Sequence, residues 1–192
     1  MSKPQKNDDG GFTIVELMVG SVISLVVLGI AFSMFDVQRK TFSIQEQRSE
    51  MQQNVRAAMD MMVREIRMAG YDPLNTGFVP ISGTSTATSL QVSADLDGSG
   101  GIVGSETVTY SYDALSLQID RNIGGGNQPF VENIAGLNFS YFDANDIVTA
   151  TVADMRKIQI QITGRTANID PRTGTFEFGT QTSFVSPKNL GY

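Results

Sequence analysis

The sequence contains no cysteine and no histidine among its 192 residues. The absence of cysteine excludes disulfide bonds and thiolate metal sites. The absence of histidine removes the commonest general base and the usual protein ligand of zinc and copper. Enzymatic chemistry would depend on Asp, Glu, Lys, Tyr or Ser alone, so we expect a protein that is not an enzyme.

Basic residues are also few. The chain has 14 Lys and Arg against 20 Asp and Glu, which gives a formal net charge of −6. Binding to a phosphate backbone needs a cluster of basic side chains, and the sequence contains none. We therefore expect no nucleic acid among the partners.

One long hydrophobic run lies near the N-terminus. Residues 17–35 carry no charge and are numerous enough to cross a bilayer as a helix. Glu16 precedes them directly, and an ionised side chain in hydrocarbon costs roughly 2.5–3.5 kcal/mol even on lenient insertion scales. Such an acid is by default functional and needs a partner. An ordinary transmembrane anchor explains the run but not Glu16.

A secretory signal peptide is another alternative for this run. Signal peptides are cut after the apolar core, at small residues. Ala31 and Ser33 lie near the end of the run, but no cleavage site of that kind follows them. The small residues Gly10 and Gly11 instead precede the run.

The residues around Glu16 form a motif, Gly10-Gly11-Phe12-Thr13-Ile14-Val15-Glu16-Leu17, behind a short polar leader. The motif resembles the prepilin signature of type IV pilins and type II secretion pseudopilins. The resemblance implies that a prepilin peptidase cuts between Gly11 and Phe12 and that the new amine of Phe12 is N-methylated. It also implies that Glu16 pairs with the α-amine of a neighbouring pilin, a charge pair that would set the axial register.

Small residues recur within the run at Gly20, Ser24, Gly29 and Ser33. A small-xxx-small spacing lets helices approach closely in lipid, so these four residues are candidates for assembly contacts. Gly and Ser are also common in transmembrane helices without such a role, and the pattern alone leaves both interpretations open.

The helix is expected to continue well past residue 35. Apolar residues recur with helical spacing on one face, at Met51, Val55, Ala58, Met62, Ile66 and Ala69. Gly70 and the following Asp72-Pro73 are typical of a helix end. The pattern predicts one helix over Phe12–Ala69, apolar all round in its first half and amphipathic in its second.

Short alternating runs follow Pro73. They predict strands at Ser89–Ala94, Glu106–Tyr112, Leu115–Arg121, Gly136–Phe142, Arg156–Arg165 and Thr175–Ser183. We expect an α+β fold in which a long N-terminal helix packs against an antiparallel β-sheet head, the pilin fold. The segments are then a leader (1–11), a transmembrane and assembly half (12–35), an amphipathic half (36–70) and a β-rich head (71–192).

Three further segments resemble the PilW-type minor pilins, which are related to type II secretion pseudopilin J. They are RMAGY at 67–71, ENIAGLNFSY at 132–141 and NLGY at 189–192. The resemblance implies a minor pilin that primes or assembles a type IV pilus with other minor and major pilins on an inner-membrane assembly platform. It also implies a single pass through the inner membrane with a cytoplasmic N-terminus and an extracytoplasmic head, and a later place at the pilus or pseudopilus tip.

A glycine-rich segment at 95–106 fits the twelve-residue EF-hand calcium loop. Its expected ligands are Asp95, Asp97, Ser99, the Gly101 carbonyl and Glu106. Ser99 at the fifth position, an apolar residue at the ninth and flanking strands instead of helices weaken the match. The alternative is a glycine-rich loop with solvated acids.

Three other functions stay open at this level. The first is a type II secretion pseudopilin of the J type, with the same fold and processing in another machine. The second is a membrane-tethered module whose head binds calcium or an adhesive ligand. The third, a membrane-anchored hydrolase, is the least favoured because the chain lacks His and Cys.

Overall fold

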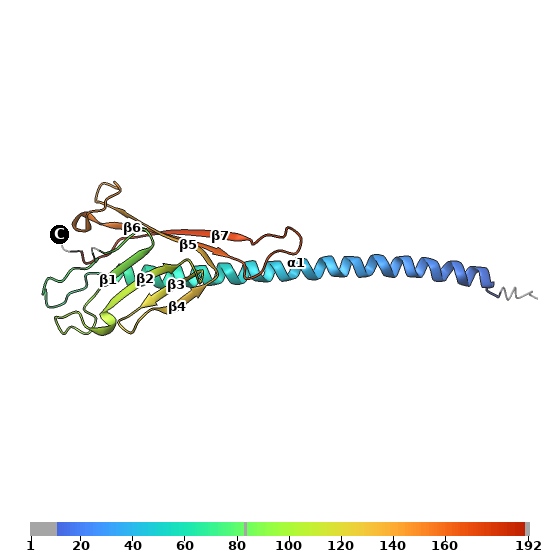
Figure 1. Cartoon of the computed structure of the whole chain (residues 1–192), viewed down its shortest axis with the longest axis horizontal. Coiled ribbons are helices and arrows are strands. Elements are labelled where there is room, and N and C mark those ends of the chain that lie inside the picture. Colours follow the sequence, from blue (N-terminus) through green and yellow to red (C-terminus); the bar gives the residue numbers. More distant parts are fainter. Residues whose placement is uncertain (1–10, 83, 191–192) are drawn as a thin grey trace, which may run out of the picture. The chain divides into compact units, whose positions relative to one another are not determined.

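The structure, a computed structural model, describes residues 11–82 and 84–190. In this part of the chain, helix α1 (Ile14–Met68) is followed by seven strands and two short 3-10 helices (Figure 1). The chain divides into two compact units between Ser43 and Ile44. Most of the expected leader, residues 1–10, lies outside the described residues, as do the last two residues of the NLGY ending.

The first unit contains the apolar half of α1. The predicted helix, Phe12–Ala69, agrees with the observed one to within two residues at the start and one at the end. Every residue from 11 to 40 is exposed. By length and composition α1 can cross a membrane. Burying so many apolar side chains in lipid removes them from water, which favours insertion.

In the second unit the rest of α1 packs against the strands through the predicted face. All six residues of that face are buried, together with Ile44 and Met59. A helix that buries one stripe in this way gains most of its stability from tertiary packing. The amphipathic pattern is confirmed.

Gly70 ends the helix, as predicted. Its φ of +81° is a left-handed conformation that glycine adopts without strain. Its N–H donates to the carbonyl of Ser93 (2.9 Å), and the N–H of Tyr71 donates back to Met68 (3.0 Å). These bonds satisfy groups that the end of a helix leaves without partners.

The strands form two antiparallel sheets, where we expected one. The first sheet has the order β1-β2-β3-β4 and the second the order β5-β6-β7. Their bounds are β1 Ser89–Ser93, β2 Thr107–Asp113, β3 Gln118–Asn122, β4 Gln128–Glu132, β5 Ile134–Phe142, β6 Lys157–Arg165 and β7 Phe178–Val185. The 3-10 helices are Gly104–Glu106 and Val152–Asp154.

The predicted strands lack β4, and the boundaries of three others are misplaced by two or three residues. β4 reads QPFVE, so Pro129 and too few apolar residues hide it from an alternation search. Leu115, predicted in a strand, lies in a turn and is 97% exposed, because the Asp113 carboxylate accepts its N–H. β5 starts two residues earlier than predicted, at Ile134, and β7 starts three residues and ends two residues later than predicted, over Phe178–Val185.

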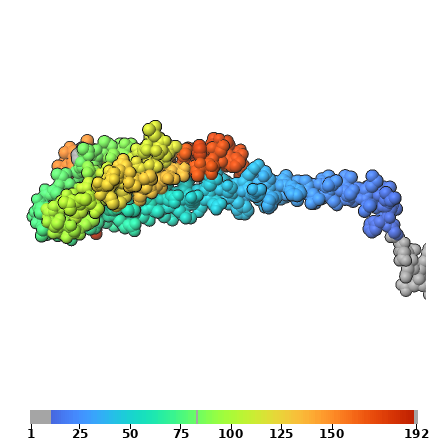
Figure 2. Space-filling view, turned by 60° about the horizontal axis from the view of Figure 1, so that its bottom comes forward, coloured from blue at the N-terminus to red at the C-terminus, as the bar shows by residue number. Residues whose placement is uncertain are grey.

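Both sheets lie along α1 within the second unit (Figure 1), and the space-filling view shows the strand-rich part of the chain packed over this part of the helix (Figure 2). The isoleucines at 158, 160 and 162 of β6 are fully buried, and Gln161 between them is exposed. They share one core with α1 and with Leu90, Tyr110 and Ile119 of the first sheet. The helix and both sheets of this unit therefore share one hydrophobic interior.

Candidate functional site

Glu16 forms a capping box at the start of α1. Its Oε2 accepts the N–H of Thr13 (2.9 Å) and the Thr13 hydroxyl (3.0 Å). The Thr13 hydroxyl oxygen accepts the N–H of Glu16 in return (3.2 Å). This reciprocal arrangement stabilises a helix start. This cap was not among the sequence predictions, although Thr-x-x-Glu ahead of an apolar run is its sequence signature.

The expected cleavage position lies just before this cap. Gly11 is exposed, and Phe12 is 90% exposed. A methyl group added to Gly11 would meet no heavy atom within 4 Å. Both residues are therefore accessible to an enzyme, and a change at Gly11 would disturb no contact of the described chain.

The four small residues of the span form two separate pairs. The hydroxyl of Ser24 donates to the carbonyl of Gly20 (2.8 Å), and that of Ser33 donates to Ile30 (2.8 Å). Gly20 and Gly29 are nine residues apart, which is about two and a half helical turns. The pairs Gly20–Ser24 and Gly29–Ser33 therefore lie on opposite sides of the helix. Their role in assembly stays a prediction.

The predicted calcium loop connects β1 to β2 and brings its three acids together. Asp95, Asp97 and Glu106 each offer a carboxylate oxygen, and these oxygens lie within 4.8 Å of one another. Asp95 is fully buried and Glu106 is 6% exposed. Among the described residues none of the three forms an ion pair with Lys or Arg. Three carboxylates at this spacing are ligands of the kind that Ca²⁺ takes.

The same acids also accept backbone N–H groups of their own loop. Asp95 accepts those of Gly98 (2.7 Å) and Gly100 (2.9 Å), and Glu106 accepts that of Leu96 (2.8 Å). Hydrogen bonds from Ser99 lower the pKa of Asp97. Gly98 and Gly100 have φ values of +72° and +81°, which the tight turn requires. The loop thus holds its three acids close together.

The other two expected ligands contact each other. The Ser99 hydroxyl donates to the carbonyl of Gly101 (3.4 Å). Strands, and not helices, flank the loop, as the sequence indicated. The geometry brings together the three acids; calcium binding itself stays a prediction.

A polar cluster that the sequence analysis did not identify joins α1 to the first sheet. Arg121 donates from its Nη2 to Glu65 Oε1 (2.6 Å) and from its Nε to Oε2 (3.3 Å). The Tyr110 hydroxyl also donates to Glu65 Oε2 (2.5 Å). Burial, followed by this bond, raises the pKa of Tyr110. Bidentate Arg–carboxylate pairs are directional, so the cluster sets how α1 sits on β2 and β3.

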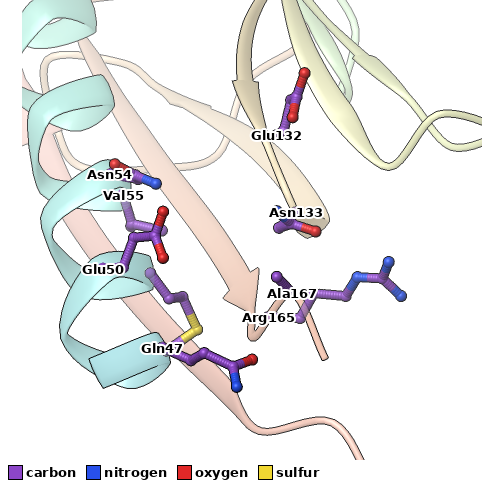
Figure 3. Close-up of a pocket in the computed structure, with 9 residues that line it drawn as sticks. Gln47, Glu50, Asn54, Val55, Glu132, Asn133, Arg165 and Ala167 are labelled. Carbon is purple, nitrogen blue, oxygen red and sulfur yellow. The ribbon is translucent and has the colours of Figure 1, made fainter. Parts of the chain in front are cut away.

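A small hollow lies between α1 and the strand ends. Gln47, Glu50 and Asn54 of the helix line one side of it, and Glu132, Asn133 and Arg165 line the other, with the Arg165 side chain pointing away from the helix (Figure 3). Its volume of about 20 Å³ is the room that one water molecule needs. A substrate does not fit there, and Arg165 instead stacks on Phe176, with 4.4 Å between the guanidinium carbon and the ring centre.

Comparison with protein families gives two matches. The family model of prepilin peptidase-dependent protein B matches residues 44–177, which covers most of the second unit. The prokaryotic N-terminal methylation motif matches residues 6–32, which include Gly11, Phe12 and Glu16. No curated protein matches the chain.

Proposed function

The chain belongs to the family of prepilin peptidase-dependent protein B, and from this membership we propose that it is a minor pilin that primes or assembles a type IV pilus. The family match and the methylation motif make it a pilin-like protein that depends on prepilin peptidase. The observation that carries the proposal is the exposed Gly11–Phe12 bond directly before a capped apolar helix.

In the proposed sequence of events, the peptidase cuts Gly11–Phe12 and methylates the new amine of Phe12. The protein waits in the inner membrane with its N-terminus in the cytoplasm and its head outside. It then joins other minor and major pilins on the assembly platform and takes a place at the filament tip. Its own role is structural and not enzymatic.

Glu16 has two tasks in this proposal. Its capping box with Thr13 stabilises the helix start. In the assembled filament its carboxylate pairs with the Phe12 amine of a neighbour, because an unpaired charge in a low-dielectric interior is far more costly than a matched pair. The opposite faces of the span, one with Gly20 and Ser24 and the other with Gly29 and Ser33, give close approach to two neighbouring helices.

A deletion of the gene tests the proposed function. We expect loss of surface pili and of twitching movement, with protein secretion unchanged. The same strain complemented with the full chain is the control. Loss of secretion with normal pili would instead assign the chain to the type II secretion system, as a pseudopilin of the J type.

We also propose that the loop at 95–106 binds Ca²⁺, because three acids converge there. Sites of modest affinity have a Kd of about 10⁻⁴–10⁻³ M. At ten times Kd, binding to the folded state alone adds about 1.4 kcal/mol. The melting temperature of the full chain in detergent should therefore rise by roughly 3–6 °C on adding Ca²⁺.

Asp97→Asn is the matched control for the calcium prediction. Asp97 is exposed, so its replacement leaves the two buried acids and the fold in place. The variant should melt as the original chain does without calcium, and the same calcium concentration should raise its melting temperature less, because one of the three negative charges is lost. An equal response of both proteins, or no response of either, would contradict a site at this loop.

A further inference from the structure

Strand edges attract other strands unless they are protected, and within residues 11–82 and 84–190 nothing gives β7 the usual protection. Natural sheets protect their edges with proline, charge, a bulge or a covering segment. β7 reads FGTQTSFV, without proline or charge. It pairs with β6 along all eight residues and without a register shift. Its outer edge is therefore long, regular and uncharged.

Within the described residues, the other three sheet edges are covered or interrupted. The outer edge of β1 is covered by the segment before it, where the N–H of Ser82 donates to the carbonyl of Gln91 (3.0 Å). At β5, Phe139 donates its N–H to Ala87 (2.7 Å). β4 contains Pro129, beside a register shift in its pairing with β3. Among the four sheet edges of the described residues, that of β7 is the one that is neither covered nor interrupted.

The open backbone groups of β7 can be assigned to alternate residues. Arg165 of β6 donates its N–H to Asn133, on the side away from β7 (2.8 Å). Residue pairs of an antiparallel ladder alternate between hydrogen-bonded and non-hydrogen-bonded. Phe178, which lies opposite Arg165 on β7, therefore forms no backbone hydrogen bond with it, and neither do the residues of every second pair along the two strands. The N–H and C=O groups that face outward therefore belong to Phe178, Thr180, Thr182 and Phe184.

Beside this edge, a hollow of about 200 Å³ separates β7 from α1. Gln52 and Arg56 of the helix line it, opposite Gly179 and Gln181. Arg56 is exposed and forms no ion pair with the part of the chain that the structure describes. On a strand added to β7, the side chain opposite Gln181 would lie beside this hollow and near Arg56.

We propose that the β7 edge accepts an extended strand from the head of another pilin-type protein, and that this strand carries an acidic side chain opposite Gln181. Strand addition to an open edge is a common mode of protein recognition, with main-chain bonds for affinity and alternate side chains for specificity. β7 itself contains no acid, so a second copy pairing through the same strand would leave Arg56 without a counter-charge. The inference rests on the proposed function, since it names the contact by which the chain joins other pilins.

Photo-cross-linking in cells that make the full chain tests the inference. A photoreactive phenylalanine analogue replaces Thr182, at the edge, or Asn138, which is exposed on β5 of the same sheet but two strands away. We expect an adduct from position 182 and at least fivefold less from 138. Mass spectrometry should map the cross-linked peptide to a strand in the head of another protein with an N-terminal methylation motif.

Two charge reversals test the role of Arg56. Arg56→Glu should lower the adduct from position 182 at least fivefold, because it would face an acid. Arg64→Glu, an exposed arginine of the same helix that lines a different hollow, should leave the adduct unchanged. Thermal unfolding of both variants shows whether the head still folds.

Several outcomes would overturn the inference. They are an equal yield from positions 182 and 138, an adduct between two copies of this chain, an adduct with a protein that lacks the methylation motif, and no effect of Arg56→Glu. Mass spectrometry of the N-terminus in the same cells reports cleavage separately. A cleaved chain without the adduct counts against the β7 contact alone. An uncleaved chain counts against the proposed function. The adduct can still be measured in that case, because prepilins share the membrane before cleavage.

Discussion

Glu16→Gln is expected to leave cleavage intact and to remove the protein from filaments. Glutamine keeps a side-chain oxygen that can accept the N–H of Thr13, so the capping box survives. It carries no charge, so the Phe12 amine of a neighbour would stay uncompensated inside the filament. Leaving one partner of a buried ion pair alone costs about 3–5 kcal/mol, which corresponds to a loss of roughly a hundredfold or more in incorporation.

The measurement is the amount of the protein in sheared surface filaments relative to the membrane fraction, together with the mass of its N-terminus. Two variants serve as controls. Thr13→Val removes the hydroxyl of the cap but keeps the acid, and should assemble. Gly11→Val meets no neighbouring atom in the fold but should block cleavage, so that no new amine forms. Normal assembly of Glu16→Gln would show that the cap, and not the charge pair, is the task of this residue.

Gly70→Val is expected to cause a large loss of stability in the head. A Cβ at this position would lie 2.4 Å from the carbonyl oxygen of Asn189 and 2.8 Å from its carbonyl carbon. The φ of +81° adds strain for any side chain, and most of all for a β-branched one. Backbone strain of about 1–3 kcal/mol and overpacking of about 1–3 kcal/mol together lower the melting temperature by roughly 5–20 °C.

Valine substitutions at two other glycines serve as controls in the same thermal unfolding measurement, and they distinguish the cost of backbone strain from the cost of the steric clash. Gly77 has a similar φ, +83°, but no atom within 4 Å of an added Cβ, so Gly77→Val should show the strain alone. Gly125→Val has neither feature and should melt close to the original chain. If Gly70→Val were no less stable than Gly77→Val, the contact between the helix end and the C-terminal segment would contribute nothing to stability.

The contacts of Gly70 show how far local sequence reasoning reaches. The sequence indicates that a helix ends there, since glycine followed by Asp72-Pro73 is a local signal. The carbonyl of Asn189 is more than a hundred residues away along the chain, and no local pattern indicates that contact. The same holds for Glu65, which the fold pairs with Tyr110 and Arg121 although neither residue is near it in the sequence.

By itself, the sequence determined the features that depend on neighbouring residues. These are the N-terminal methylation motif, the helix to within two residues, its buried face, and the isoleucine pattern of β6. Each follows from a period or a short spacing, and so does the Thr13–Glu16 cap. The sequence also indicated part of the acidic cluster, because the spacing of Asp95, Asp97 and Glu106 placed all three in one twelve-residue loop.

Only the tertiary structure decided which strands are neighbours. Pairing across a sheet depends on contacts between distant residues, so the division into two sheets, the existence of β4 and the open edge of β7 were beyond a search for alternation. A free edge is a property of what does not pack beside a strand, and no strand sequence contains that information. For this reason the motif at the N-terminus identifies the kind of protein, whereas the surface proposed to choose its partner emerges only from the folded head.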